Sequence, residues 1–223
     1  MNSHLIKYPV QYTIFTIFTI QLLNGFFLSN LYQYSPSFFW VFDAFQFVFL
    51  PALFLYLLYT KYSITPSSYG LVIPDNKHQA KELLLIIIYC TLLLQLFSFV
   101  SYEMTKAFIA KGTTGNYQSV IPTGSLQIPV IIYMSLTAAI VEEIFYRGLP
   151  LLILKNIFTG KKLEYLYIYT TTFIFTLVHW ENGFPDIVSS FIYGIFAASF
   201  YLQFKRLIPI IVAHFVINMV VFL

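Results

Sequence analysis

Three charged residues stand close together inside an apolar stretch of the chain, between Val141 and Gly148. A charge at the centre of a bilayer costs at least ~2.5–3.5 kcal/mol, so Glu142, Glu143 and Arg147 each need a partner or a purpose. On a helix Glu143 and Arg147 share a face, with the acid N-terminal to the base, which is the better order for an ion pair. Glu142 points about 100° away from that face. The pattern is typical either of a structural ion pair with a spare carboxylate or of a carboxylate kept for chemistry.

Two histidines and an asparagine follow in later apolar stretches. His179 lies near the end of one stretch, and His214 lies inside the last one, four residues before Asn218. This spacing places His214 and Asn218 on one helical face. A lone histidine in a span is more often a hydrogen bonder between helices than a catalyst. Polar groups on three separate apolar stretches indicate instead a shared water-filled site or an ion pathway.

These residue types suit the hydrolysis of an amide bond. That reaction needs a base for the water, donors for the developing oxyanion and an acid for the leaving amine. Glu142, in a low dielectric and without an ion-pair partner of its own, is suited to accept a proton and pass it on. Asn218 offers an N–H donor and His214 a second one, which leaves His179 to position the water with Glu142. The set therefore meets the requirements of a peptidase site, and an ion pathway remains the alternative.

The elements that must position these residues are membrane-spanning helices. Of 223 residues 59% are hydrophobic and only 9% are charged, against roughly 25% charged in a soluble domain. Apolar runs long enough to cross ~30 Å of hydrocarbon recur from end to end. We therefore expect an all-α, polytopic transmembrane bundle that forms one integral membrane domain over residues 1–223, with the peptidase motifs within 128–223. Seven spans are predicted, at about 9–31, 37–59, 82–104, 128–152, 165–181, 186–204 and 207–223.

Other polar residues lie within these spans. Gln21, Asn24 and Gln95 are interpreted as hydrogen bonders between helices. Asp43 and Gln46, in the second span, are candidates to line the same cavity as Glu142.

The basic residues predict an orientation, because Lys and Arg are retained on the cytoplasmic side. Nine fall on one side of the seven-span arrangement, namely Lys7, Lys61, Lys77, Lys81, Lys155, Lys161, Lys162, Lys205 and Arg206, and two, Lys106 and Lys111, on the other. We therefore expect a cytoplasmic N-terminus. The membrane in which we expect this integral protein is a bacterial plasma membrane. The net charge of +3 is too small to suggest nucleic acid as a partner.

Three motifs occur in order on three different predicted spans: Glu142-Glu143-x-x-x-Arg147, Phe175-x-x-x-His179 and His214-x-x-x-Asn218. Together they resemble the motif set of the CPBP intramembrane proteases, also called the Abi family, which includes the type II CAAX prenyl proteases. The resemblance covers about residues 128–223. It implies a helical bundle in the lipid bilayer that cleaves a peptide, or a prenylated or other membrane-associated protein, with a glutamate-activated water.

The resemblance also assigns a role to each motif residue: the catalytic glutamate, Glu142; the histidine that helps to hold and activate the water, His179; the oxyanion-binding pair, His214 and Asn218; and a supporting ion pair, Glu143 and Arg147. It favours a site without metal or other cofactor. The residues themselves leave a metal site open, since Glu142, His179 and His214 would form a two-histidine, one-carboxylate set like that of zinc peptidases. Against this, the sequence contains no His-Glu-x-x-His helix.

Two non-peptidase functions also fit buried acidic and histidine residues. A proton-coupled transporter would place such groups in its spans. Inverted repeats with broken helices are expected of a transporter, and none is evident here. The second alternative is a non-catalytic membrane protein that confers immunity to a bacteriocin, which is another role reputed for the family.

Overall fold

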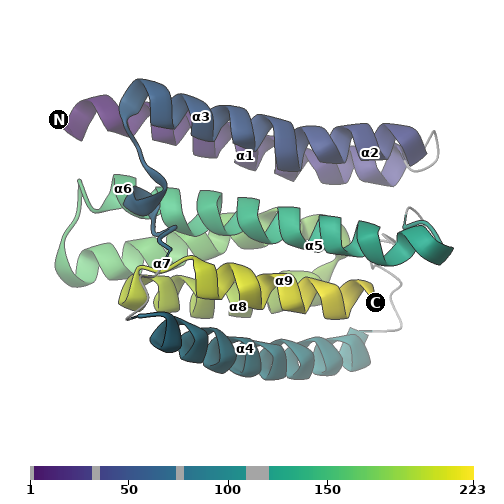
Figure 1. Cartoon of the computed structure of the whole chain (residues 1–223). Coiled ribbons are helices and arrows are strands. Elements are labelled where there is room, and N and C mark those ends of the chain that lie inside the picture. The colour runs from purple at the N-terminus through teal and green to yellow at the C-terminus, as the bar shows by residue number, and fades with distance from the viewer. Residues whose placement is uncertain (1–2, 32–35, 74–77, 109–120) are drawn as a thin grey trace.

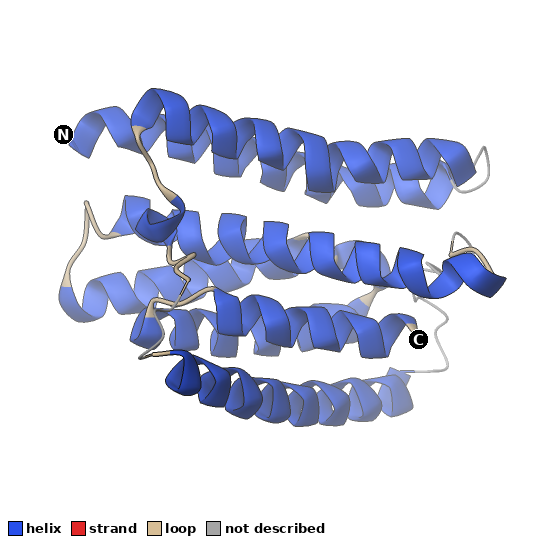
Figure 2. Ribbon diagram, viewed as in Figure 1, coloured by secondary structure: helices blue, strands red, loops and turns tan. Residues whose placement is uncertain are grey.

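The computed structural model describes residues 3–31, 36–73, 78–108 and 121–223. In this part of the chain every regular element is helical (Figure 2). The elements are α1 (Ser3–Leu31), α2 (Pro36–Ala44), η1 (Phe45–Phe49), α3 (Leu50–Tyr62), η2 (Pro66–Tyr69), α4 (Gln79–Phe108), η5 (Gly124–Leu126), α5 (Gln127–Glu143), η6 (Ile144–Gly148), α6 (Leu149–Leu154), α7 (Gly160–Leu177), η7 (Trp180–Asn182), α8 (Phe184–Phe204) and α9 (Ile208–Phe222). The predicted all-α fold is confirmed.

Two of the long helices contain a π-helical turn and are otherwise continuous. One comprises α2, η1 and α3, and the other comprises α5, η6 and α6. Within the described residues the helices that are long and apolar enough to cross a membrane are Ser37–Tyr62, Gln79–Val100, Gly124–Leu154 and Phe184–Phe204, and Ile208–Phe222 is apolar but shorter. The number of spans, seven, therefore remains a prediction.

The helices lie in layers with their axes roughly aligned (Figure 1). The pair α1 and α3 forms one outer layer, α5 and α7 lie beneath it, α8 and α9 follow, and α4 covers the opposite edge. The most extensive contacts join α7 to α8 and α9 to both α4 and α5. Thus α5, α7, α8 and α9, which carry or flank the motif residues, form the centre of the bundle.

The outer surfaces of this bundle are apolar. Large side chains such as Phe15 on α1, Phe49 before α3, Phe99 on α4 and Phe173 on α7 are exposed. A soluble protein rarely exposes apolar surface on this scale, whereas lipid is the matching solvent for it. The chain is an integral membrane protein.

The fifth predicted span is longer than the helix that forms there. The prediction placed 165–181 in one span, but α7 ends at Leu177 and the chain turns through Val178 and His179 into η7. Gly183 then adopts φ 87° and ψ 179°, a conformation that favours glycine, and Pro185 begins α8. His179 therefore lies in a turn and not in a membrane helix. Of the basic residues counted for the orientation, Lys77 and Lys111 lie outside the described residues.

Candidate active site

The paired glutamates lie at the end of α5, directly before the π turn of η6. In this turn the N–H of Leu149 bonds to the carbonyl of Ile144, five residues back. Pro150 follows, and a proline has no N–H and its ring crowds the carbonyl four residues earlier, so a widened turn is the relaxed solution. Leu149 and Pro150 thus explain locally why the helix changes pitch next to Glu143.

Glu143 lies at the centre of a buried cluster of polar and charged side chains. Its Oε1 accepts hydrogen bonds from Nδ1 of His214 at 2.8 Å and from the hydroxyl of Tyr193 at 3.0 Å. Its Oε2 lies 3.4 Å from Nε of Arg147, one turn away, and both side chains are fully buried. The glutamate therefore links α5 to α8 and α9 as well as to the arginine on its own helix.

Arg147 is held by aromatic rings as well as by charge. Its guanidinium carbon lies 3.8 Å from the ring centroid of Phe175 and 5.6 Å from that of Tyr193. The face of an aromatic ring attracts a cation, most strongly where water is excluded. Tyr167 also donates a hydrogen bond to the backbone carbonyl of Arg147 at 3.0 Å. The buried charge of Arg147 is thus accommodated by the two rings together with Glu143.

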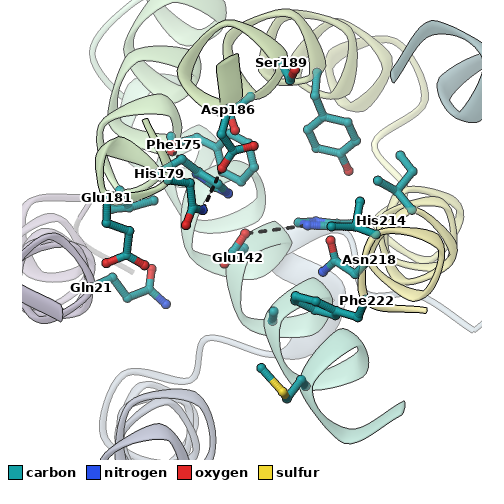
Figure 3. A pocket seen from close by; sticks show the side chains of 18 of the residues that line it. Gln21, Glu142, Phe175, His179, Glu181, Asp186, Ser189, His214, Asn218 and Phe222 are labelled. Atoms are coloured by element: carbon teal, nitrogen blue, oxygen red, sulfur yellow. Dashed lines mark hydrogen bonds and ion pairs between the residues drawn. The ribbon is translucent and has the colours of Figure 1, made fainter. Parts of the chain in front are cut away.

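His214 connects the two glutamates. Its Nε2 lies 3.7 Å from Oε2 of Glu142, as the dashed line in Figure 3 shows, while Nδ1 contacts Glu143. A carboxylate can only accept, so Nδ1 carries a proton and Nε2 carries a second proton only when the ring is the imidazolium. Glu142, which the sequence left without a partner, therefore has one on α9.

His179 is oriented by the end of α7. Its Nδ1 lies 2.8 Å from the backbone carbonyl of Phe175. The carbonyl must accept, so Nδ1 is the donor and Nε2 is left as the acceptor when the ring is neutral. The adjacent Trp180 donates a hydrogen bond from Nε1 to the carbonyl of Leu22 at 3.0 Å, which anchors this turn on α1.

These groups line a cavity of about 380 Å³. Glu142, His179, His214 and Asn218 all contribute to its wall, and Figure 3 shows Asn218 beside His214 on α9. Among residues not predicted from sequence, the wall includes Glu181, Asn182 and Asp186, and Asn182 donates a hydrogen bond to Asp186 at 2.7 Å. Their positions near a predicted span end gave no signal, because acids and amides are ordinary there.

The other embedded polar residues divide in an unexpected way. Gln46 lines the cavity as predicted, whereas Asp43 does not and is instead hydrogen-bonded to Tyr133. Gln21 and Asn24 also line the cavity, in addition to any role between helices, and Gln95 is exposed on α4. Among the residues that the structure describes, no group of three His, Cys, Asp or Glu side chains is arranged to hold a metal ion.

Fold and site together define a class of protein: an integral membrane helical bundle in which one of two adjacent glutamates, two histidines and an asparagine line a cavity. Residues 124–220 match the family described as Type II CAAX prenyl endopeptidase Rce1-like. The match covers the part of the chain that carries all three motifs, and the resemblance found in the motifs is confirmed. No curated protein and no solved structure shows a significant match to the chain.

Proposed function

We propose that this protein is an intramembrane endopeptidase in which a water activated by Glu142 attacks a peptide bond. The observation that carries the proposal is the pair formed by Glu142 and Nε2 of His214, 3.7 Å apart at the wall of an internal cavity. Glu143 contacts the other ring nitrogen of His214, Nδ1, and so orients the ring. Carboxylates orient metal-binding histidines in the same way. We take Glu142, His179, His214 and Asn218 as the catalytic residues, and Glu143 with Arg147 as the supporting pair.

The first step forms the bond between the water oxygen and the substrate carbonyl carbon. The water is held by Glu142 and by Nε2 of His179, and it gives a proton to Glu142 as it attacks. Negative charge then develops on the carbonyl oxygen. The amide N–H of Asn218 and the Nε2–H of His214, in its imidazolium form, donate to that oxygen.

The second step breaks the carbon–nitrogen bond. Glu142 returns its proton to the leaving amine, so the carboxylate is regenerated and one water is consumed for each bond cleaved. Glu143 orients the ring of His214, because its carboxylate accepts a hydrogen bond from Nδ1 at 2.8 Å. Arg147 in turn lies 3.4 Å from Glu143 and offsets the charge of that carboxylate beside the site.

The substrate in this proposal is a peptide or a prenylated or other membrane-associated protein that reaches the cavity from the lipid. A bundle with an apolar outer surface suits such a substrate, since its apolar parts stay in the bilayer until cleavage. We further propose that residues 1–223 form one membrane domain with a cytoplasmic N-terminus in a bacterial plasma membrane.

The proposal is tested by replacing Glu142 with Gln in purified protein. Glutamine keeps the size and hydrogen-bonding shape of the side chain but cannot accept the proton. We expect hydrolysis of a fluorogenic prenylated peptide ending in Cys-aliphatic-aliphatic-X to fall to background with the melting temperature kept. Glu103→Gln, on α4 and outside the cavity wall, is the matched control and should retain activity. Full hydrolysis by Glu142→Gln would show that another group is the base.

The same preparation tests the metal alternative. We expect the wild-type enzyme to stay active after exhaustive chelation and to contain no stoichiometric zinc. Loss of activity on chelation, restored by zinc, would recast Glu142, His179 and His214 as ligands.

The two non-peptidase alternatives, an immunity protein and a proton-coupled transporter, predict different results for the Glu142→Gln variant. Protection against a bacteriocin that survives Glu142→Gln would identify a non-catalytic immunity protein. Proton-coupled flux that disappears in Glu142→Gln, without cleavage by either form, would identify a transporter.

A further inference from the structure

One wall of the active-site cavity comes from helices that lie outside the family match. Gln21 and Asn24 of α1 and Gln46 of η1 line the cavity, whereas the match begins at residue 124. Figure 3 places Gln21 across the cavity from His214, with Glu142 between them. The N-terminal helices therefore contribute polar groups to the same space as the catalytic residues.

These three amide side chains are buried but incompletely hydrogen-bonded. Gln21 is 5% exposed, Asn24 7% and Gln46 1%. Within the described residues Nε2 of Gln21, Oδ1 of Asn24 and Oε1 of Gln46 have no hydrogen-bond partner. A buried polar group without a partner costs about 1–3 kcal/mol. All three side chains line one cavity, so a small movement of each would let a molecule bound there satisfy these groups.

Local structure fixes two of the three amides. The hydroxyl of Tyr146, in the π turn after the glutamates, donates to Oε1 of Gln21, which leaves the NH₂ group of Gln21 as the free donor. Gln46 lies in a second π turn, where the N–H of Leu50 bonds to the carbonyl of Phe45 and Pro51 follows. Both π turns thus precede a proline. One carries Gln46, which lines the cavity, and the other carries Tyr146, which holds Gln21 there.

We propose that Gln21, Asn24 and Gln46 form a subsite that binds the main chain of the substrate peptide in an extended conformation. The subsite offers one donor, from Gln21, and two acceptors, from Asn24 and Gln46. A peptide segment presents the complementary groups, a carbonyl oxygen and two N–H groups. This inference rests on the proposed peptidase function and adds how the substrate is recognised.

The chemistry of a membrane substrate explains why amides would be needed. Cleavage requires the scissile bond to be exposed, so a helical segment must unwind locally. In the bilayer each freed peptide group costs several kcal/mol unless it finds a partner, and apolar side chains cannot supply one. Amide side chains satisfy both donors and acceptors and need no change of protonation. Because these amides would bind the main chain of the substrate, peptides with different side chains could occupy the subsite.

The test measures binding in a protein that cannot cleave. A fluorescent prenylated peptide ending in Cys-aliphatic-aliphatic-X is titrated against the Glu142→Gln protein in detergent, by fluorescence anisotropy. Adding Gln46→Leu to that protein should weaken binding about 3- to 10-fold, as expected for one lost hydrogen bond. Gln95→Leu, the same substitution on an exposed residue of α4, is the matched control and should leave binding unchanged.

A second set of peptides identifies the main chain as the ligand. Each peptide carries one N-methylated amide, which removes a single N–H donor. N-methylation of the amide that Gln46 binds should weaken binding to the Glu142→Gln protein. In the protein that also carries Gln46→Leu, the same N-methylation should not weaken binding any further. If the amides bind only water, the loss of affinity caused by N-methylation and the loss caused by Gln46→Leu should be independent and therefore additive. Additive effects at every position would overturn the proposal.

The unliganded protein gives a further readout. If Oε1 of Gln46 has no partner until substrate binds, Gln46→Leu should raise the melting temperature or leave it unchanged. A lower melting temperature with unchanged peptide binding would show that Gln46 is structural. Lack of measurable binding by the Glu142→Gln protein also overturns the subsite. If the effects of N-methylation and Gln46→Leu on binding are non-additive as predicted, but the wild-type protein does not cleave the peptide, the peptidase function is contradicted and the subsite is not.

Discussion

Glu143 makes more contacts with charged and polar groups than Glu142 does, although the two are adjacent in sequence. It contacts Arg147, His214 and Tyr193, all of them buried. Removing one partner of a buried ion pair typically costs ~3–5 kcal/mol, because the other charge stays buried without compensation. In the proposed mechanism the two neighbouring carboxylates therefore divide between positioning, by Glu143, and proton transfer, by Glu142.

We predict that Glu143→Ala lowers the yield and melting temperature of detergent-extracted protein more than Glu142→Ala does. The reason is that Glu143→Ala leaves Arg147 without its carboxylate inside the bundle. Glu142 instead faces the cavity, where water can replace its contacts. Equal yields and equal melting temperatures for the two variants would contradict this division.

Asn218 is predicted to act chiefly in the transition state. Loss of one oxyanion donor costs ~2.7–4 kcal/mol, so Asn218→Ala should lower kcat about 10²- to 10³-fold with little change in KM. The measurement is steady-state hydrolysis of the prenylated peptide. Asn156→Ala is the control, since Asn156 bonds to the carbonyl of Leu152 and is absent from the cavity wall. A raised KM with unchanged kcat would show that Asn218 contacts the ground-state substrate.

At the scale of elements, two glycines allow close packing around the site. A Cβ on Gly148, at the end of the π turn, would lie 2.7 Å from the backbone oxygen of Tyr69. The adjacent residue Gly70 accepts a hydrogen bond from the N–H of Leu207 at 2.9 Å, so this loop is fixed against the start of α9. A Cβ on Gly194 of α8 would instead meet the Thr172 side chain of α7 at 3.0 Å.

These contacts predict different costs for the same substitution. Replacing glycine with alanine inside a helix stabilises the helix by roughly 1 kcal/mol. At Gly148 we expect the backbone clash to outweigh that gain and destabilise by about 1–3 kcal/mol, because the loop carbonyl cannot move away. Gly194→Ala is the comparison and should cost less, since its nearest contact is a side-chain methyl that can shift and the backbone Cα of Thr172 lies further away, at 3.3 Å. Thermal unfolding in detergent measures both, and an unchanged melting temperature for Gly148→Ala would refute the fixed loop.

At the scale of the whole molecule, the two chain termini lie at opposite ends of the bundle. The N-terminus and the α6–α7 connection lie at one end of the bundle, and the C-terminus lies at the other (Figure 1). Lys161 and Lys162 begin α7 at the first of these ends. This distribution agrees with the orientation proposed from the positive residues.

The orientation is testable because the chain has a single cysteine, Cys90. In a Cys90→Ser protein, a cysteine replacing exposed Ser125 should react with a membrane-impermeant maleimide added to intact cells. A cysteine replacing Lys162 should react only after the cells are permeabilised. The opposite pattern would place the N-terminus outside.

Sequence alone determined the features that depend on local spacing and on composition. The abundance of apolar residues predicted a membrane-embedded all-α chain, since only such helices satisfy their own backbone in lipid. The i,i+4 spacing brought Glu143 within reach of Arg147, because neighbours on a helix are fixed by its pitch. The motif order also indicated the protease family before any packing was known.

Tertiary structure decided the features that depend on one helix lying against another. Only the contact of α5 with α9 brings both ring nitrogens of His214 between the two glutamates. The end of α7 before His179 depends on Gly183 and on the anchoring of Trp180 to α1, which no periodicity reveals. Gln21 and Gln95 look alike in sequence, yet one lines the cavity and the other is exposed. Each residue's own spacing fixes only its helical face, and the packing of distant helices decides what that face meets.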